Sequence, residues 1–196
     1  MKKKSKILIS VGLILVIIAL GITGYNIFAT FRARTSSKKI LQQLSETNVN
    51  TQTEKYPEYM LNPNMKMPVK NIDGVECVGM LYIPSLNLEL PVQNEWSLDK
   101  LLRTPCRYYG SAYLNNMVIC AHNYYYHFGK LRRLSVGDDI IFIDTEKNEF
   151  KYKVTEVLIL DPYSTEEMKN GNCGLTLFTC TLGGRTRITV RCEKQV

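Results

Sequence analysis

The strongest constraint in this chain is a run of 25 residues without a charge, residues 7–31, near the N-terminus. At about 1.5 Å per residue, a helix of this length spans the roughly 30 Å hydrocarbon core of a bilayer. The alternatives are a buried core helix and a cleaved signal peptide, whose apolar core is normally only about 7–15 residues long and ends at a cleavage site. Basic residues follow the run here, so the sequence predicts an uncleaved membrane helix over residues 7–31, after a basic tail over residues 1–6.

The positive charge of the chain belongs to the flanks of this run. The net charge is +7, but residues 1–39 contain eight basic residues and no acid, which leaves −1 for residues 40–196. The folded part is therefore nearly neutral, and it has no basic stripe with interleaved aromatic residues, which excludes a nucleic-acid-binding face. Basic residues flank the apolar run on both sides, so the charges give almost no bias to its orientation.

Residues 32–75 form a polar segment with a Ser-, Thr-, Asn- and Gln-rich centre and three prolines, Pro57, Pro63 and Pro68. This composition predicts an extracytoplasmic stalk. The spacing of apolar residues within 37–44 predicts a short helix there.

From residue 76 onward, short runs rich in β-forming residues alternate with turn signals. The runs 139–144 and 149–160 flank a four-residue turn and predict a hairpin. Helical spacing is confined to residues 98–102 and 164–169. Many short strands with one or two short helices predict a mostly β domain, a closed or nearly closed barrel over residues 76–196. The other predicted strands are 78–83, 86–92, 117–121, 175–180 and 187–192.

Six cysteines and two histidines limit the chemistry of this domain. The absence of a Cys-x-x-Cys pair argues against a metal site. A free thiol, with a pKa of about 8.5, is mostly protonated at neutral pH, so a nucleophilic cysteine needs a nearby histidine or cation. His122 ends the apolar run MVICAH, where a strand meets a loop, whereas His127 lies in the aromatic stretch YYYHFG. From these residues alone, a Cys–His pair is more often structural than catalytic.

The C-terminal part of the chain resembles the signature of the sortase family, a T-L-x-T-C strand followed by a strand that opens with an arginine. Thr176, Leu177, Thr179 and Cys180 match the first strand within LTLFTC, and Arg187 in RTRITVRC fits the arginine position. Upstream, VICAHN resembles the histidine strand of the family, and LSVGDD resembles its L-x-V-G-D strand opener. The resemblance runs from about residue 78 to residue 193, with histidine, cysteine and arginine in the order of the family.

This resemblance implies a closed sortase-type β-barrel of about eight strands and a cysteine transpeptidase. Cys180 is then the nucleophile, His122 the acid and base, and Arg187 the residue that binds the substrate or the developing oxyanion. Thr179 and Thr181 flank the cysteine and are the candidate substrate-binding residues. For Thr179, a structural role inside the barrel is an equal alternative.

Strand geometry favours Arg187 over the two other nearby arginines. A six-residue connection lets strands 175–180 and 187–192 pair, which brings Cys180 and Arg187 to the same end of the pair. Arg185 lies in the turn itself. Arg191 lies four residues farther along the strand, about 13 Å away at the usual rise per residue.

The resemblance also implies partners and a location. The partners are secreted surface proteins that carry a C-terminal sorting motif, and an amine acceptor from a peptidoglycan precursor or a pilin. The location is the cell membrane, with a single span, a cytoplasmic N-terminus and an extracellular catalytic domain. No cofactor is implied, and the class within the family stays open. Two alternatives are a different cell-envelope cysteine transpeptidase or peptidase that uses Cys180 and His122, and a membrane-tethered β-domain without enzymatic activity.

Overall fold

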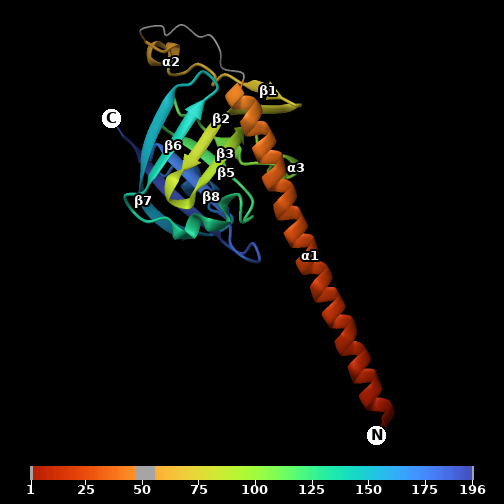
Figure 1. Ribbon diagram of the computed structural model, residues 1–196. Helices are drawn as coiled ribbons and strands as arrows, with labels where there is room; N and C mark the ends of the chain where they lie inside the picture. The colour runs from red at the N-terminus through yellow and green to blue at the C-terminus, as the bar shows by residue number, and fades with distance from the viewer. Residues whose placement is uncertain (1, 47–55, 196) are drawn as a thin grey trace.

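The computed structural model describes residues 2–46 and 56–195. Its first element, α1 (Lys2–Glu46), is one continuous helix of 45 residues, and its N-terminal part projects far beyond the rest of the molecule (Figure 1). The side chains of residues 8–28 are exposed throughout, although nearly all of them are apolar or small. Among the described residues, Leu8–Ser45 of this helix is the one segment long and apolar enough to cross a membrane. The predicted membrane helix falls on this exposed part.

The C-terminal part of α1 packs against the β-domain. Ala33, Ile40 and Leu44 are almost completely buried. Ile40 and Leu44 belong to a small apolar cluster that also contains Ile72 and Cys77 of the β-domain. The residues with the predicted short helix, 37–44, are therefore the last turns of α1, and helix and barrel are in direct contact within the predicted stalk.

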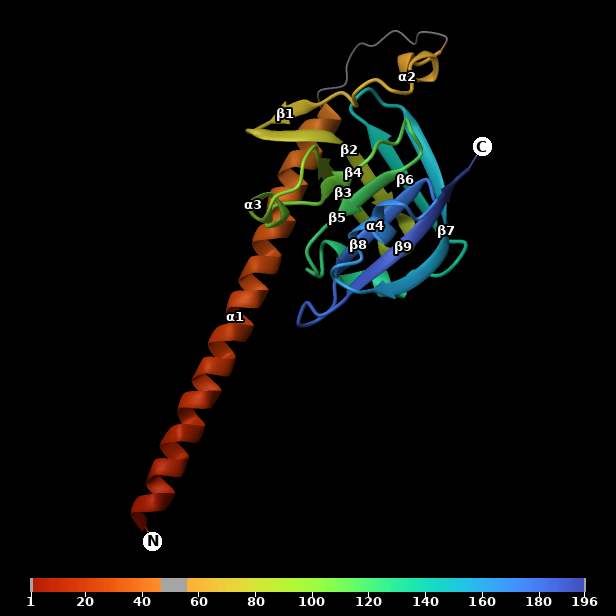
Figure 2. The same cartoon turned by 180° about the vertical axis from the view of Figure 1, so that it is seen from behind.

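Nine strands form one sheet with the order β1-β2-β3-β4-β5-β8-β9-β7-β6 (Figures 1 and 2). An additional antiparallel pairing of β2 with β6 closes strands β2 to β9 into a barrel, and β1 extends β2 outside the closed ring. The eight-stranded barrel expected from the sequence is thereby confirmed. The strands are β1 (Lys70–Ile72), β2 (Val75–Ile83), β3 (Leu88–Gln93), β4 (Cys106–Tyr109), β5 (Met117–Cys120), β6 (Asp139–Asp144), β7 (Glu149–Leu160), β8 (Leu175–Cys180) and β9 (Arg187–Lys194).

Short helices fill the connections between strands. They are α2 (Glu58–Leu61), the 3-10 helix η1 (Pro84–Leu86), α3 (Leu98–Leu101), the 3-10 helix η2 (Phe128–Arg133) and α4 (Thr165–Lys169). The predicted helical segments 98–102 and 164–169 correspond to α3 and α4. The Ser97 hydroxyl accepts a hydrogen bond from the backbone of Lys100, which is the N-cap arrangement that starts α3.

The barrel interior holds the main apolar core because side chains alternate along each strand. Ile119 of β5, Leu177 of β8 and Val190 of β9 are fully buried members of this core. The predicted hairpin of β6 and β7 is confirmed, and Phe142 and Phe150 of this hairpin are directly paired and fully buried.

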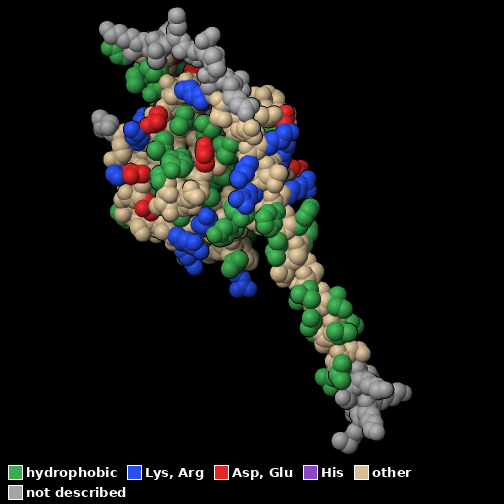
Figure 3. Space-filling model, viewed as in Figure 1, with side chains coloured by type: hydrophobic (Ala, Val, Ile, Leu, Met, Phe, Trp, Pro, Cys, Tyr) green, Lys and Arg blue, Asp and Glu red, His purple; other side chains and the backbone are tan. Residues whose placement is uncertain are grey.

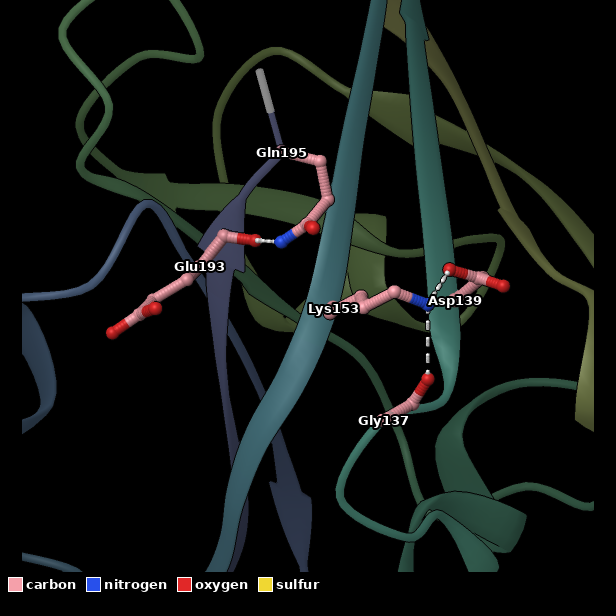
Figure 4. A network of polar contacts seen from close by, with 5 residues as sticks. All are labelled: Gly137, Asp139, Lys153, Glu193 and Gln195. Atoms are coloured by element: carbon pink, nitrogen blue, oxygen red, sulfur yellow. Dashed lines mark hydrogen bonds and ion pairs between the residues drawn. The ribbon is translucent and has the colours of Figure 1, made fainter.

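The outer surface of the β6–β7 hairpin is polar. Lys153 of β7 forms an ion pair with Asp139 of β6 at 2.7 Å, and it also donates to the Gly137 carbonyl at 3.3 Å (Figure 4). Near the C-terminus the Gln195 amide donates to the carbonyl of Glu193 at 3.3 Å. Such exposed pairs add little to stability, so the barrel depends chiefly on its apolar interior.

Candidate active site

The three residues singled out by the sequence lie at neighbouring strand ends. In the antiparallel pair of β8 and β9, Cys180 is directly opposite Arg187. In the parallel pair of β5 and β8, Cys120 is opposite Phe178. When this register is continued two residues beyond the end of β5, it places His122 level with Cys180. Neighbouring strands are about 4.8 Å apart, so Cys180 sits between the histidine and the arginine.

All three side chains belong to the outer face of the barrel. Cys120 and Phe178, two residues before His122 and Cys180, are members of an apolar cluster separate from the barrel core. Ala121, which lies between Cys120 and His122, and Leu177, which precedes Phe178, belong to that core. Alternation along the strands therefore turns the candidate nucleophile, base and arginine away from the interior and toward a common surface.

Thr179 joins the two strand ends that carry the cysteine and the histidine. Its side chain is 1% exposed, and its hydroxyl donates a hydrogen bond of 2.8 Å to the carbonyl of Ala121, the residue before His122. Thr181 closes the turn after Cys180: its hydroxyl lies 3.0 Å from that of Thr186 and accepts a hydrogen bond from the Thr186 backbone at 3.2 Å. Both hydroxyl groups are thus engaged within the protein, and for Thr179 this geometry matches the structural alternative.

His122 is half-buried, and burial lowers the pKa of its imidazole, which favours the neutral ring. The ring lies 4.9 Å from the ring of Tyr124, and the carbonyl of His122 accepts a hydrogen bond from the backbone of Phe128. Within the described ranges no carboxylate is hydrogen-bonded to the imidazole. A neutral imidazole beside a thiol is able to accept the thiol proton.

Cys180 differs from most of the other cysteines in its accessibility. Cys180 and Cys173 are half-buried, whereas the remaining four thiols are buried. Burial raises the pKa of Cys77 and of Cys106 to about 12 and also raises the pKa of Cys120. A thiol with so high a pKa is a poor nucleophile at neutral pH. Of the two accessible thiols, Cys180 is the one beside a histidine.

The arginines occupy different environments. Arg187 is half-buried, and its guanidinium donates to the turn carbonyls of Gly184 at 2.9 Å and Thr186 at 3.2 Å. Arg185 is exposed in that turn. Arg191 is 5% exposed. It pairs in register with Thr176, four residues before Cys180 on β8.

The Arg191 guanidinium forms its hydrogen bonds with groups that lie away from Cys180. It donates to the carbonyls of Glu167 at 2.5 Å and Met168 at 3.0 Å, and to the Thr176 hydroxyl at 2.9 Å. These contacts fasten α4 to the sheet. Of the three arginines, only Arg187 both lies at the end of the strand pair, opposite Cys180, and has a guanidinium that is hydrogen-bonded only to carbonyls of the turn.

An apolar surface extends from Cys180 along the outside of the barrel. Phe178 packs edge-on against Tyr108 of β4 with ring centroids 5.3 Å apart, and Tyr108 lies 5.5 Å from Trp96. Tyr108 and Trp96 line a cavity of about 360 Å³ together with Arg107 and Tyr109. Sequence reasoning missed these residues, because β4 is short and its pairing with β3 is a single parallel contact. In the described part of the chain, no three His, Cys, Asp or Glu side chains cluster as metal ligands would.

The fold and the candidate site together are those of a closed β-barrel with a cysteine and a histidine at adjacent strand ends. The family model described as the sortase domain matches residues 81–195, more than half of the chain. The chain therefore belongs to the sortase family.

Individual relatives agree with this assignment. The chain is 30% identical over 116 residues to Sortase A of Bacillus anthracis, a match that covers 56% of this chain and 55% of that protein. It therefore spans about half the length of that relative.

Solved structures are similar in fold. The Clostridium perfringens Sortase D5 transpeptidase has a TM-score of 0.58 at 18% identity, with 84% of this chain and 98% of that chain covered. Sortase C1 of Streptococcus agalactiae has a TM-score of 0.56 at 22% identity, with 81% and 89% covered. Sortase C of Clostridium perfringens SM101 has a TM-score of 0.52 at 23% identity, with 86% and 90% covered. These neighbours carry different class letters, and the class of this chain is left open.

Proposed function

We propose that this chain is a membrane-anchored sortase that cleaves a C-terminal sorting motif in secreted surface proteins and transfers the acyl part to an amine. The observation that supports the proposal is the strand register, which pairs Cys180 with Arg187 and Cys120 with Phe178, two residues before His122 and Cys180. Family membership supplies the reaction class, and the arrangement of these three side chains supplies the roles.

In the first half of the reaction, the neutral His122 ring accepts the proton of the Cys180 thiol, and the thiolate sulfur forms a bond to the carbonyl carbon of the scissile peptide. The carbonyl oxygen gains negative charge, and the Arg187 guanidinium stabilises it by donating hydrogen bonds. As the peptide C–N bond breaks, protonated His122 gives its proton to the departing amine. The products are a thioester on Cys180 and the released C-terminal fragment.

In the second half, an incoming amine attacks the thioester carbonyl, and the neutral His122 ring accepts one of its protons. Collapse of the oxyanion breaks the C–S bond, forms a new amide and returns the thiolate of Cys180. A peptidoglycan precursor and a pilin lysine are the proposed amine donors. The lowered pKa of His122 suits this half, because the ring must be neutral to accept the proton.

The outer apolar surface is the proposed floor for the sorting motif. Phe178 precedes the nucleophile on its own face, and Tyr108 and Trp96 continue the surface across β4. An extended peptide laid along this floor would bring its scissile carbonyl to Cys180. Thr179 and Thr181, whose hydroxyls bond within the protein, shape the site by fixing the ends of β5 and β8.

The anchor is the apolar part of α1, with the N-terminus in the cytoplasm and the barrel outside. The barrel then faces secreted proteins and the cell wall. Exposed apolar side chains over residues 8–28 support the anchor, since they would otherwise face water.

The decisive experiment is transpeptidation by the full chain in detergent micelles or nanodiscs. A panel of sorting-motif peptides is incubated with a primary amine, and the transfer and hydrolysis products are separated by mass. We expect amine-dependent transfer that Cys180→Ala abolishes and that the matched variant Cys173→Ala retains. Hydrolysis without transfer across the panel would instead identify a peptidase, and loss of activity only in Cys173→Ala would refute the assignment of the nucleophile.

A further inference from the structure

A groove of about 680 Å³ separates α1 from the barrel, next to the loop that begins at His122. Helix residues form one wall, β2 and β3 form the floor, and the loop after β5 with the start of η2 forms the other wall. Neither the proposed reaction nor the proposed peptide floor uses it. Its lining residues that matter here are Arg34, Lys38, Glu89, Tyr125, Tyr126 and Lys130.

The groove opens where the apolar part of α1 ends. Phe31 is the last residue of the charge-free run, and its ring centroid lies 6.3 Å from that of Tyr126. Arg34, one turn farther along, donates to the Tyr126 hydroxyl at 3.2 Å. At about 1.5 Å per residue, Lys38 lies roughly 10 Å beyond Phe31. The headgroup layer of a bilayer is about 5–8 Å thick on each side, so the backbone of Arg34 falls within it and that of Lys38 lies a few ångströms beyond it.

Positive charge converges on this groove. Arg34, Lys38 and Lys130 line it, and Glu89 is the one acidic residue among its described lining residues. In the described ranges, no carboxylate forms an ion pair with any of the three cations. Figure 3 shows Lys and Arg side chains gathered where α1 lies against the barrel. An anion in the groove would therefore meet three cations that have no ion-pair partner among the described residues.

Two tyrosines hold the cations in place. The Arg34 guanidinium lies 4.2 Å from the centroid of the Tyr126 ring, and the Lys130 ammonium lies 4.6 Å from that of Tyr125. Lys130 also donates to the carbonyl of Leu86 at 3.1 Å. Tyrosine rings are common at the level of lipid headgroups, where one end of the side chain is apolar and the other is wet.

We propose that this groove binds the phosphate of an anionic phospholipid headgroup and thereby seats the His122 end of the barrel against the bilayer. The proposal rests on the membrane anchor of the proposed function, and adds a lipid site that the transfer reaction itself does not require. Tyr125 and Tyr126 belong to the loop that follows His122, and the carbonyl of His122 is hydrogen-bonded to Phe128 at the end of that loop. A headgroup in the groove would therefore contact the loop that begins at His122 of the candidate active site.

The test measures the reactivity of individual lysines in the full chain. The protein is placed in nanodiscs of phosphatidylcholine alone or with about 30 mol% phosphatidylglycerol, which gives an anionic surface. The lysines are then methylated with formaldehyde, an uncharged reagent, and a reductant. Mass spectrometry then gives the rate at each lysine. Each lysine near an anionic surface strengthens membrane binding roughly fivefold. Because a lysine bound to a phosphate is shielded from the reagent, Lys38 and Lys130 should react about fivefold more slowly in the anionic discs. Lys66 and Lys147, in the loop before β1 and in the β6–β7 turn, should react equally in both.

A matched pair of arginine variants separates a site from a general surface potential. Arg32 and Arg34 carry the same charge on the same turn of α1, but Arg34 lines the groove and Arg32 does not. Arg34→Gln should remove the lipid-dependent protection of Lys38 and Lys130, whereas Arg32→Gln and Arg34→Lys should retain it. Equal rates in the two kinds of disc would overturn the proposal, and so would equal loss of protection in both glutamine variants.

Two further measurements identify the ligand and separate this proposal from the enzymatic one. Inorganic phosphate added to neutral discs should not protect the lysines; protection by phosphate alone would mean a free-anion site and overturn the headgroup proposal. Transfer activity is measured on a soluble peptide in the same discs. A chain with protected lysines and no transfer refutes only the enzymatic function, and an active chain with unprotected lysines refutes only the lipid site.

Discussion

Truncation of the two arginines of β9, Arg187 and Arg191, to alanine should impair two different properties, catalysis and stability. Arg191 is 5% exposed and donates to two carbonyls of α4 and to the Thr176 hydroxyl. Arg187 is half-buried and donates only to carbonyls of the turn, which water can solvate in its place. Arg191→Ala should therefore reduce stability, and Arg187→Ala should reduce catalysis.

The magnitudes follow from these contacts. A hydrogen bond from a charged donor contributes about 1.5–3 kcal/mol, so the three bonds of Arg191 have a gross value of several kcal/mol. Burying its guanidinium without a carboxylate partner offsets part of this. We expect Arg191→Ala to lower the free energy of unfolding by about 2–4 kcal/mol. Arg187→Ala should cost less than about 1 kcal/mol of stability but lower kcat by roughly 100- to 1000-fold, as removal of one oxyanion donor does.

Both quantities are measurable on the full chain in detergent. Urea unfolding is followed by the fluorescence of Trp96, the single tryptophan, and transfer is measured at a urea concentration of zero, where each variant is folded. Arg185→Ala, in the exposed turn, is the control and should leave both quantities unchanged. An Arg191→Ala protein of full stability without activity, together with an active Arg187→Ala protein, would show that the wrong arginine had been assigned to the reaction.

The accessible thiols Cys173 and Cys180 should react rapidly with N-ethylmaleimide at pH 8. Cys77 and Cys106, with a pKa of about 12, are only about 0.01% ionised at this pH and should stay unmodified, which peptide mapping measures. Burial lowers the pKa of His127 to about 4, below its unfolded value of about 6.5, so the folded state binds fewer protons and stability falls as the pH drops through this window. Urea titrations should show a loss of about 2 kcal/mol between pH 7 and pH 5 that His127→Asn lacks. Thr179→Val should lower the free energy of unfolding by about 1–2 kcal/mol and reduce kcat more than it changes KM, because the bond to Ala121 holds the His122 strand end; unchanged kinetics would contradict this.

Much of the fold was predictable because its signals are local. The β6–β7 hairpin follows from two β-forming runs around a four-residue turn, and alternation correctly separates the inward Leu177 from the outward Phe178. Strands β1 and β4 were not predicted. Each has only three or four residues, which is too few to show an alternation in the sequence, and each is stabilised by its pairing with the next strand, β1 with β2 and β4 with β5.

The position of α1 was also beyond local signals. Composition indicated a polar stalk after the membrane helix, but Ile40 and Leu44 continue the helix and bury against the barrel. Their partners, Ile72 and Cys77, lie about thirty residues on in the chain, so no window of the sequence contains both sides of the contact. The groove between α1 and the barrel exists only because of this long-range packing.

The sequence by itself determined the apolar run long enough for a membrane, the strand-rich domain, and the identity and order of histidine, cysteine and arginine. These depend on local composition and on strand alternation, which a linear chain already contains. Tertiary structure alone decided that the end of β5, which leads into His122, lies beside the end of β8, that Arg191 is bound to α4, and that Thr179 bonds to Ala121. The physical reason is that β5 and β8 are more than fifty residues apart, and only the closure of the barrel brings their ends into hydrogen-bonding distance.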